Sequence, residues 1–554
     1  MSHQARRPTI QGLRHTISAG QYLAAQAGFQ ILEAGGNAID AGVAAGIAMG
    51  VVQSEYVNIA GVAPIMIYLA NTREVVTISG LGVWPRAASL DKFDGCIPDG
   101  VLRTVVPAAP DAWITALERY GSLTFGDVAK EAIRFARDGF VMYPAMSEII
   151  GSCAEDLARW PSNSAIYLPD GRVPKPGELF VQQDLAGTLQ YMVDEEASAG
   201  TREAGLQAAR EAFYRGDIAQ RIVSYHENNG GLLTMQDMAD FHVGIEPSVS
   251  TQVLGATVHT CDTWTQGPVL LQMLKLLEGM HLDRLEHNSP AYVHTLLEAM
   301  KLAFADREAY YADPRFHDVP LRILLSDAYN ADRRNLIRMD KAISDVSPGN
   351  VSGTRGLERG QLDTSYVCAI DAAGNAFSST PSDVIADTPI IPGTGLAPSS
   401  RGSQSWAVPG HPCEIKPGTR PRLTPNPAIL LDEKMVMPFG TPGGDVQCQA
   451  MLQFLLNHRL FNMPIQEAIE APRFATFSFP ASFEPHEYLA NQVNLEARIP
   501  QQTGAALANM GHDVQWWDDW TLKAGGVCAA SREHHTGLTA AGADPRRACY
   551  ALGW

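Results

Sequence analysis

The segment LDTSYVCAIDAAGNAFSS, residues 362–379, constrains the fold more than any other part of the chain. From Thr364 to Ile370 its side chains alternate between the two faces of an extended strand, and AAGN (372–375) makes a turn into AFSST. Both faces of this predicted hairpin are mostly apolar. Because an apolar face must be covered, the hairpin is expected at the centre of a sheet with packed layers on both sides.

Length and charge narrow the class of protein. The chain has 554 residues, of which 45% are hydrophobic and 18% charged, so it can bury one large core or the cores of two tightly joined domains. Sixty acidic residues against 42 basic ones give a formal charge of −18. This charge repels phosphate backbones and anionic lipid, which argues against nucleic acid and membrane surfaces as partners.

The cysteines and the apolar segments predict a cytoplasmic protein. Eight cysteines are scattered without a C-x-x-C pair or a zinc-like Cys/His spacing, so free thiols in a reducing compartment are expected. The first twenty residues contain no apolar core of seven or more, so no secretory signal is predicted. The longest apolar stretch, residues 38–52, is too short to span a bilayer and carries Asp40, so it is interpreted as a buried helix.

Helical patterns dominate the first two thirds of the chain. Asn37 can cap the helix of small residues at 38–52, and from about 107 to 340 the pattern is mainly helical. One long helix is predicted to begin with Ser289 as its cap and Pro290 at its first position, and to end near Pro314. The polar, Gly- and Ser-rich stretch from about 340 to 362 is expected to be exposed and mobile.

Two further hairpins are predicted. APIMIYLA is expected to pair with REVVTISGLG, and AILLDEKMVMPFG forms a hairpin that runs into the glycines of GTPGG. DVQCQAMLQFLLNH then begins a helix. No internal repeat or low-complexity tract is present in the sequence.

The usual catalytic motifs are missing. The sequence has no G-x-S-x-G, no H-E-x-x-H and no Walker loop, and its histidines have no metal-ligand spacing. A threonine at a new chain end needs no such partners, because its own α-amine, with a pKa of about 7.7–8, can take the hydroxyl proton. Thr364 would gain such an amine by self-cleavage between Asp363 and Thr364; viewed alone, it can equally be an ordinary strand residue.

The glycine turn at residues 440–444 is a second candidate for chemistry. Backbone N–H groups of Gly443 and Gly444, together with the following helix terminus, suit an oxyanion hole. The same turn suits a bound phosphate, and a plain tight turn is an equally good interpretation. GTPGGD matches neither G-x-G-x-x-G nor the Walker pattern, which weakens the nucleotide hypothesis.

Taken together, these motifs resemble the γ-glutamyltranspeptidase family of amino-terminal-nucleophile hydrolases over some 530 residues of the chain. The quoted segments that carry the likeness are LAAQAGFQILEAGGNAIDAGVAAGIAMGVV, EAMKLAFADREAYYADP, TSYVCAIDAAGNAFS, GTRPRLTPNPAILL, FGTPGGD and ADPRRACYALGW. The resemblance implies an α+β fold, a four-layer αββα sandwich formed by two autocleaved subunits. The large subunit would comprise residues 1–363 and the small subunit residues 364–554.

The resemblance also implies roles for individual residues. Thr364, rather than Ser365, matches the nucleophile, and Ser382 falls where the family has a Thr that orients it. Gly443 and Gly444 match the oxyanion-hole pair, and Thr424 matches a serine that lines the substrate pocket.

Departures from the family pattern concern the γ-glutamyl head group. The family's arginine for the substrate carboxylate is expected near Leu81, with Arg86 only a loose substitute. The family's acidic residue for the substrate amino group is expected in the segment LAPSSRGSQSW. This segment contains Ser403 and Gln404 but no carboxylate. Another family position, an asparagine, is Val384 here. Arg401, Gln404 and Arg422 remain as candidate substrate-binding residues, although each arginine can equally be structural.

The sequence therefore predicts a self-processing Thr amidohydrolase or acyltransferase that opens a small-molecule amide through a Thr364 acyl-enzyme, on an acyl group other than γ-glutamyl. Alternatives are an authentic γ-glutamyltransferase or glutathione hydrolase, an unprocessed homologue that only binds a ligand, and a nucleotide-binding protein. No cofactor or metal is predicted. The expected partners are the substrate and the two subunits of one precursor, and a homo-oligomer is left open.

Overall fold

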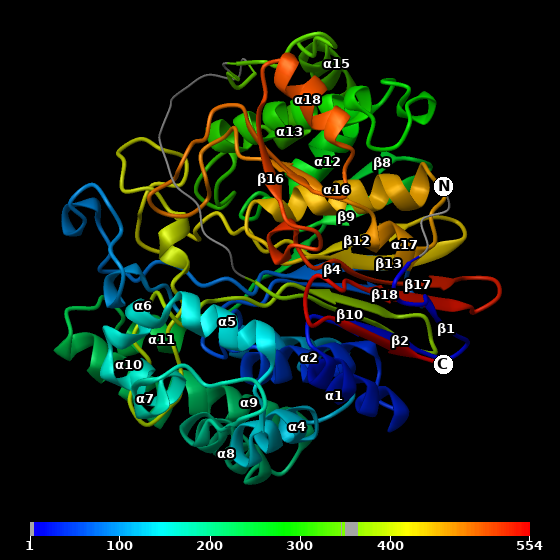
Figure 1. The fold of residues 1–554 in the computed structure, drawn as a ribbon. Helices are drawn as coiled ribbons and strands as arrows, with labels where there is room; N and C mark the ends of the chain where they lie inside the picture. The colour runs from blue at the N-terminus through cyan, green and yellow to red at the C-terminus, as the bar shows by residue number, and fades with distance from the viewer. Residues whose placement is uncertain (1–4, 345, 350–363) are drawn as a thin grey trace.

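Two seven-stranded sheets lie face to face at the centre of the molecule (Figure 1). The computed structural model describes residues 5–344, 346–349 and 364–554. The first sheet has the order β1 (Ile10–Gly12), β18 (Thr539–Ala543), β17 (Cys528–Glu533), β13 (Met435–Gly440), β12 (Ala428–Leu431), β9 (Ala256–Thr260), β8 (Val249–Val253). The second has the order β19 (Tyr550–Gly553), β2 (Thr16–Ala19), β10 (Val367–Ile370), β11 (Ala376–Ser379), β3 (Ile65–Leu69), β4 (Glu74–Ile78), β7 (Ile245–Pro247).

Helices cover the outer face of each sheet, so the order of layers is helix, sheet, sheet, helix (Figure 1). The helices on the side of the second sheet are α1 (Tyr22–Glu33), α2 (Ala38–Val52), α3 (Ala109–Tyr120), α4 (Phe125–Asp138), α5 (Pro144–Ser152), α6 (Ala154–Ala158), α7 (Pro161–Tyr167), α8 (Gln183–Ala197), α9 (Arg202–Tyr214), α10 (Asp217–Asn228) and α11 (Met235–Asp240). Those on the side of the first sheet are α12 (Gly267–Leu277), α13 (Pro290–Tyr310), α14 (Leu321–Leu324), α15 (Asp327–Arg334), α16 (Val446–Arg459), α17 (Ile465–Glu470) and α18 (Gln501–Asn509). The predicted αββα sandwich is confirmed.

Three apolar clusters fill the spaces between the layers. One packs α1–α4 and α8–α10 against Ile17, Val367, Ala369 and Phe377 of the second sheet. Another packs α12, α13 and α16 against the first sheet. The third lies between the sheets and contains Tyr366, Cys368 and Ile370. Residues of β10 thus alternate between two buried layers, as the apolar faces of the hairpin predict.

The central hairpin is confirmed, with one difference at its start. β10 pairs with β11 and β2, and β11 pairs with β3, so the hairpin lies inside the sheet. The strand begins at Val367 rather than at Thr364. Thr364 has a φ of +95°, a conformation that interrupts a strand.

Other local predictions agree with the structure. Asn37 caps α2 in a capping box with Asp40, and every residue of α2 is buried. Ser289 caps α13, which begins at Pro290 and ends at Tyr310. β3 pairs with β4, and β12 pairs with β13.

The prediction that residues 107–340 are mainly helical missed five strands, the short β5 (Phe140–Val141) and β6 (Leu179–Phe180) and three more. β7, β8 and β9 lie between residues 245 and 260, and β8 and β9 form a hairpin whose residues alternate in burial. The alternation in SVSTQV and ATVHT was the available signal. Two small sheets, β14 (Phe474–Thr476) with β15 (Gln492–Glu496) and β16 (Asp513–Trp517), and β5 (Phe140–Val141) with β6 (Leu179–Phe180), lie outside the two large ones.

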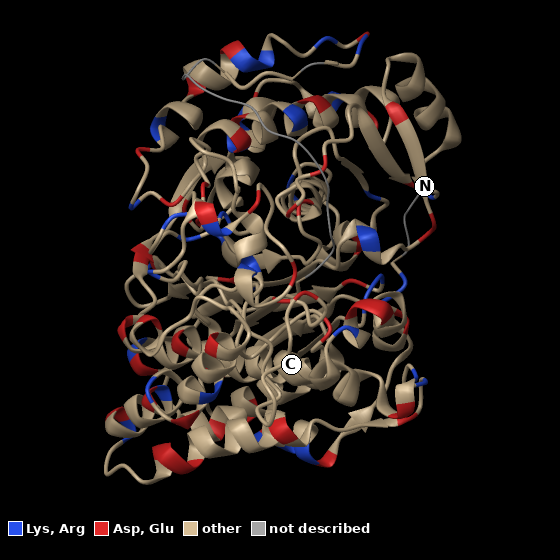
Figure 2. Ribbon diagram, turned by 90° about the vertical axis from the view of Figure 1, so that its left-hand side faces the viewer, with Lys and Arg blue, Asp and Glu red and all other residues tan. Residues whose placement is uncertain are grey.

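Charged residues of both signs are spread over the outer helices and loops, and the central strands carry fewer of them (Figure 2). Within the described ranges, none of the helices has the combination of length and apolar character needed to cross a membrane. The predicted mobile loop at about 340–362 lies mostly outside the described residues. All eight cysteines are free thiols.

Candidate active site

Thr364 lies in a buried, strained position next to the central hairpin. Its side chain is fully buried, and its φ of +95° is a conformation that β-branched residues rarely adopt, at a typical cost of about 1–3 kcal/mol. The neighbouring Ser365 faces the other way, because its Oγ donates to Gln53 Oε1 at 2.6 Å. The two hydroxyls therefore have different surroundings, and only that of Thr364 faces the other predicted site residues.

Ser382 and Arg401 lie next to the Thr364 hydroxyl. Thr364 Oγ1 and Ser382 Oγ are 2.8 Å apart, within hydrogen-bond distance. Arg401 Nη2 donates to Ser382 Oγ at 2.7 Å. All three side chains are buried, so the contacts act in surroundings where electrostatic effects are stronger than in water.

Asp383 supports the arginine from the neighbouring position. Arg401 Nε lies 3.5 Å from Asp383 Oδ1, and Asp383 also accepts hydrogen bonds from Ser399 and Ser400. Burial raises the pKa of Asp383 to about 7 and lowers the pKa of Arg401 to about 9. Desolvation thus outweighs attraction for both groups at this separation, and the guanidinium remains protonated at neutral pH.

The predicted oxyanion turn lies at the amino end of α16. Gly443 and Gly444 have φ values of +124° and +57°, which favour glycine, and α16 begins at Val446. Among the described residues, neither glycine N–H donates a hydrogen bond to a backbone acceptor. The Gln447 side-chain amide, in the first turn of α16, lies 3.4 Å from Thr364 Oγ1. This contact places the helix terminus, with its partial positive charge, beside the threonine.

Thr424 and Gln404 lie near the same helix end. Gln404 Nε2 donates to Thr424 Oγ1 at 2.9 Å, and Gln404 Oε1 is buried without a hydrogen-bond partner in the described part of the chain. The far side of the Gln447 amide lies 3.2 Å from the carbonyl oxygen of Thr424. Gln447 therefore connects this pair with Thr364.

Arg422 points to a different partner. Its guanidinium donates to Glu308 Oε2 at 2.7 Å and to the carbonyl oxygen of Arg307 at 3.0 Å. Burial alone would raise the pKa of Glu308, but Arg422 and the neighbouring His411 and Arg307 hold it well below its usual value. Arg422 thus forms a buried ion pair with α13, and none of the hydrogen bonds or ion pairs given for it among the described residues involves Thr364.

The structure also shows the residues that stand where the family resemblance predicts γ-glutamyl-binding side chains. Leu81 is buried in the core between the sheets, and Arg86 is exposed in an ion pair with Asp240. Ser403 Oγ donates to the carbonyl oxygen of Ser400. None of these described residues offers a cation or a carboxylate to the site. Asp363, on the other side of the predicted cleavage point, lies outside the described residues.

Three residues near Thr364 were missed by the sequence analysis: Gln447, Asp383 and Arg547. Arg547 Nη1 lies 3.5 Å from the Thr364 carbonyl oxygen. Gln447 and Arg547 are 83 and 183 residues away along the chain. Two of the three had a sequence signal: Asp383 is the neighbour of Ser382, and Arg547 lies in the segment ADPRRACYALGW, which carries part of the family resemblance.

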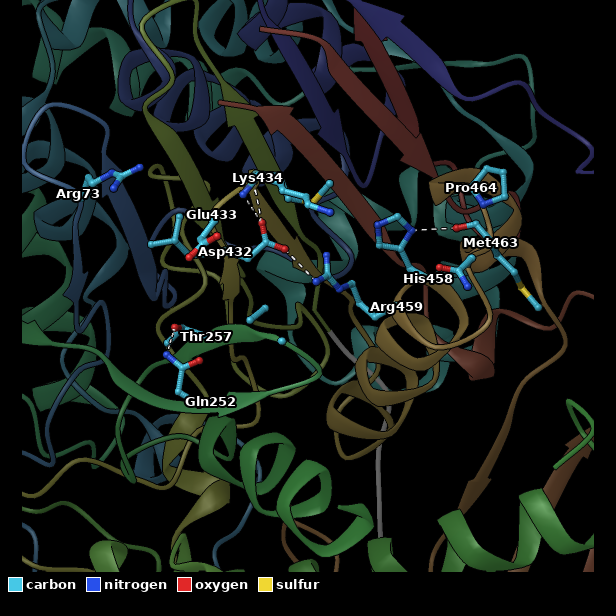
Figure 3. Close-up of a pocket in the computed structure, with 15 residues that line it drawn as sticks. Arg73, Gln252, Thr257, Asp432, Glu433, Lys434, His458, Arg459, Met463 and Pro464 are labelled. Atoms are coloured by element: carbon cyan, nitrogen blue, oxygen red, sulfur yellow. Dashed lines mark hydrogen bonds and ion pairs between the residues drawn. The ribbon is translucent and has the colours of Figure 1, made fainter. Parts of the chain in front are cut away.

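Two cavities lie at opposite ends of β13. A cavity of about 320 Å³ includes Gly443 in its wall. A larger one, about 920 Å³, is drawn in Figure 3 and surrounds the β12–β13 turn at Asp432, Glu433 and Lys434. Since β13 has six residues, the strand separates the two by about 17 Å. Asp432 pairs with Arg459 at 2.8 Å across the larger cavity, which contains none of the predicted site residues (Figure 3).

One cluster in the described ranges has the ligand types of a metal site. His294, Glu298 and His512 are buried and have ligand atoms within 4.8 Å of one another. Lys301 Nζ lies 2.8 Å from Glu298 Oε1, and the two histidine rings are joined by a hydrogen bond of 2.9 Å. The ammonium group already supplies the cation that the carboxylate requires, so these residues fit a buried hydrogen-bond network better than a metal centre.

Comparisons with known proteins identify the family. Residues 24–554 match the family model described as Gamma-glutamyltranspeptidase. The chain is 33% identical over 523 residues to the Acylase ACY 1 proenzyme of Pseudomonas sp. (strain SE83), covering 91% of this chain and 88% of that protein. It is 31% identical over 555 residues to the Glutathione hydrolase-like YwrD proenzyme of Bacillus subtilis (strain 168), covering 98% and 99%.

A solved structure agrees with this assignment. The cephalosporin acylase from Bacillus halodurans matches with a TM-score of 0.87 and 28% identity, covering 100% of this chain and 98% of that one. The fold and the sequence comparisons thus point to one group of hydrolases. The chain belongs to the γ-glutamyltranspeptidase family.

Proposed function

We propose that this chain is a self-processing amidohydrolase whose nucleophile is Thr364 and whose acyl group is not γ-glutamyl. The observation that carries the proposal is the contact of 2.8 Å between Thr364 Oγ1 and Ser382 Oγ, next to Arg401 and the amino end of α16. Two of the relatives are named as proenzymes, which supports processing of the precursor.

The first reaction is cleavage of the chain. Thr364 Oγ1 attacks the carbonyl carbon of Asp363, an O–C bond forms, the C–N bond between residues 363 and 364 breaks, and the proton passes to the nitrogen. Breaking the C–N bond frees the Thr364 α-amine and leaves an ester on Oγ1; water then hydrolyses that ester, which restores the Thr364 hydroxyl and gives Asp363 a new terminal carboxylate. The φ of +95° at Thr364 favours this step, because cleavage removes the peptide bond that defines this torsion.

The second reaction is amide hydrolysis. The α-amine takes the Oγ1 proton, Oγ1 attacks the substrate carbonyl carbon, and the leaving nitrogen receives the proton as the C–N bond breaks. N–H groups of Gly443 and Gly444 stabilise the oxyanion. Water, deprotonated by the same amine, then hydrolyses the acyl-enzyme.

Arg401 polarises the Ser382 hydroxyl in this proposal. A guanidinium only donates, so Ser382 Oγ accepts from Arg401, and either hydroxyl can donate across the contact between Ser382 Oγ and Thr364 Oγ1. Oγ1 can then direct its proton to the amine while it accepts from Ser382. As negative charge develops on Oγ1, the polarised serine hydroxyl stabilises it. Arg401 is therefore a positioning residue.

The charges of the residues around the site support an acyl group other than γ-glutamyl. A γ-glutamyl head group carries a carboxylate and an ammonium, and each requires a partner of opposite charge when it is buried. Leu81, Ser403 and Gln404 supply neither charge. An acylase acting on an acyl group without this zwitterion is consistent with the acylase name of one relative.

Two assays test this function. Thr364→Ala should remain one chain on a denaturing gel and should have no amidase activity. Thr364→Ser, which keeps a hydroxyl, should retain part of the self-cleavage and part of the amidase activity. Purified wild-type protein is then assayed with γ-glutamyl anilide and with anilides of neutral acyl groups. Faster hydrolysis of a neutral acyl anilide supports the proposal; preference for the γ-glutamyl anilide would contradict the acyl assignment, and cleavage of the Ala variant would contradict the nucleophile.

A further inference from the structure

The cavity that includes Gly443 has walls of a defined chemical kind. Its volume is about 320 Å³, within the range of small-molecule sites. Apolar side chains form much of its wall; they are Val446, Phe477, Phe479, Ala481, Leu489 and Trp517. Lys523 is exposed at its margin.

The aromatic part of the wall is held in place from behind. The Phe479 ring stacks on Phe304 of α13, with centroids 3.8 Å apart and planes 13° apart. Phe477 and Trp517 contact edge to face, with centroids 6.3 Å apart. Because these ring contacts hold the wall in place, the wall loses little conformational entropy when a ligand binds.

Two carboxylates, Asp445 and Glu487, line the cavity, and Asp445 is already neutralised. Asp445 accepts from the Ser482 backbone N–H at 2.7 Å and from Ser482 Oγ at 2.6 Å, and it is paired with Arg307. The same contacts fix residues 481–482 against the start of α16. A cationic group entering the cavity would therefore find Asp445 already paired, whereas an apolar ring would meet surfaces of its own kind.

We infer that this cavity binds an aromatic or branched aliphatic group of the amide substrate, on either the acyl or the amine side of the scissile bond. The inference rests on the proposed function, because Gly443 both lines the cavity and is placed in the oxyanion hole. A group attached to a carbonyl carbon held at Gly443 would lie beside this cavity. The substrate class is thus an amide with one bulky apolar substituent.

Two variants change the size of the cavity from half-buried positions outside the catalytic residues. Phe477→Ala removes an aromatic wall, and Leu489→Trp fills the space. Phe316→Ala is the matched control, because Phe316 is 51% exposed and does not line the cavity. Each variant is assayed with two series of amide substrates. In the first series the amine is constant and the acyl group varies from acetyl to phenylacetyl. In the second the acyl group is constant and the amine varies from methylamine to benzylamine.

The inference predicts that in one series Phe477→Ala and Leu489→Trp each lower kcat/KM for the aromatic member by roughly 10- to 200-fold, with the small member and the Phe316→Ala control unchanged. The affected series identifies which side of the amide enters. Equal effects on small and aromatic members, or none in either series, would overturn the inference.

A binding measurement separates this inference from the proposed function. The chain is labelled with 5-fluorotryptophan, and the Trp517 signal is assigned with Trp517→Phe. Benzyl alcohol, which has no amide bond, should shift the Trp517 signal in the ¹⁹F spectrum, and Leu489→Trp should abolish the shift. An unshifted signal at saturating probe would contradict the cavity assignment even if Thr364 hydrolyses amides.

Discussion

Arg401 donates a hydrogen bond of 2.7 Å to Ser382 Oγ, and both side chains are fully buried. The arginine was predicted as a candidate for the substrate anion, and this contact places its guanidinium next to the residue that contacts the proposed nucleophile. Ser382 is the group that connects them, since it lies 2.8 Å from Thr364 Oγ1.

Removal of the Arg401 charge should lower kcat more than it changes KM. Arg401→Gln is expected to lower kcat by roughly 10- to 100-fold, the value of one charge-assisted hydrogen bond, with a smaller change in KM. Loss of a nearby positive charge should also raise the apparent pKa on the acid side of the kcat/KM profile, because that limb reports the Thr364 α-amine.

Arg401→Lys is the conservative control, since it keeps the charge and one donor. It should recover part of kcat and return the acid limb toward the wild-type value. An Arg401→Gln enzyme with unchanged kcat and pH profile would remove Arg401 from the mechanism.

We expect Ser382 to support kcat by donating a hydrogen bond from its hydroxyl group rather than by the packing of its side chain. Ser382→Ala is expected to lower kcat roughly 100-fold, whereas Ser382→Thr, which keeps the hydroxyl, should stay close to wild type. The measurement is kcat on the processed fraction of each variant. Equal losses in both variants would indicate that packing at this position, not the hydroxyl, supports activity.

Gly443 should not accept a side chain. At its φ of +124° an alanine is strained, and relief of the strain would turn the N–H away from the oxyanion, so Gly443→Ala should lose roughly 100- to 1000-fold in kcat. Gly410→Ala is the control, because Gly410 has a φ of +81° and a Cβ there would meet nothing within 4 Å. Full activity of Gly443→Ala would exclude this N–H from the oxyanion hole.

Asp313 should make stability depend on pH. Burial opposes ionisation of Asp313, yet Arg315 and Arg420 lower its pKa from 3.8 to about 2. A lowered pKa means that the carboxylate stabilises the folded chain above about pH 4 and that this contribution, about 2 kcal/mol, is lost as pH falls toward 2.

Urea unfolding of the Thr364→Ala chain at pH 6 and at pH 2.5 measures this contribution. Asp313→Asn should reduce the difference between the two midpoints. Asp340→Asn should leave it unchanged, because Asp340 and its partner Arg338 are exposed. The same pH dependence in Asp313→Asn as in its parent would show that another group is responsible.

Local sequence signals predicted much of the fold. The caps at Asn37 and Ser289 and the three hairpins follow from short-range patterns, and the structure confirms them. The strands at 245–260 were missed because a helical pattern on both sides of them dominated the interpretation.

The conformation of Thr364 had no such signal. Alternation predicted a strand from residue 364, but Ser365 N–H pairs with the Pro381 carbonyl oxygen and the Tyr366 carbonyl oxygen pairs with Gly20 N–H. These distant contacts fix the chain immediately after Thr364. The contacts with Gln447 and Arg547 likewise join positions that no local pattern relates.

The most direct test of the account is intact mass spectrometry of the purified wild-type protein, with amino-terminal sequencing of each chain. Self-cleavage before Thr364 should give two chains, of which the smaller begins TSYV at Thr364. A single chain of 59.9 kDa, or a smaller chain that begins at any other residue, would contradict it.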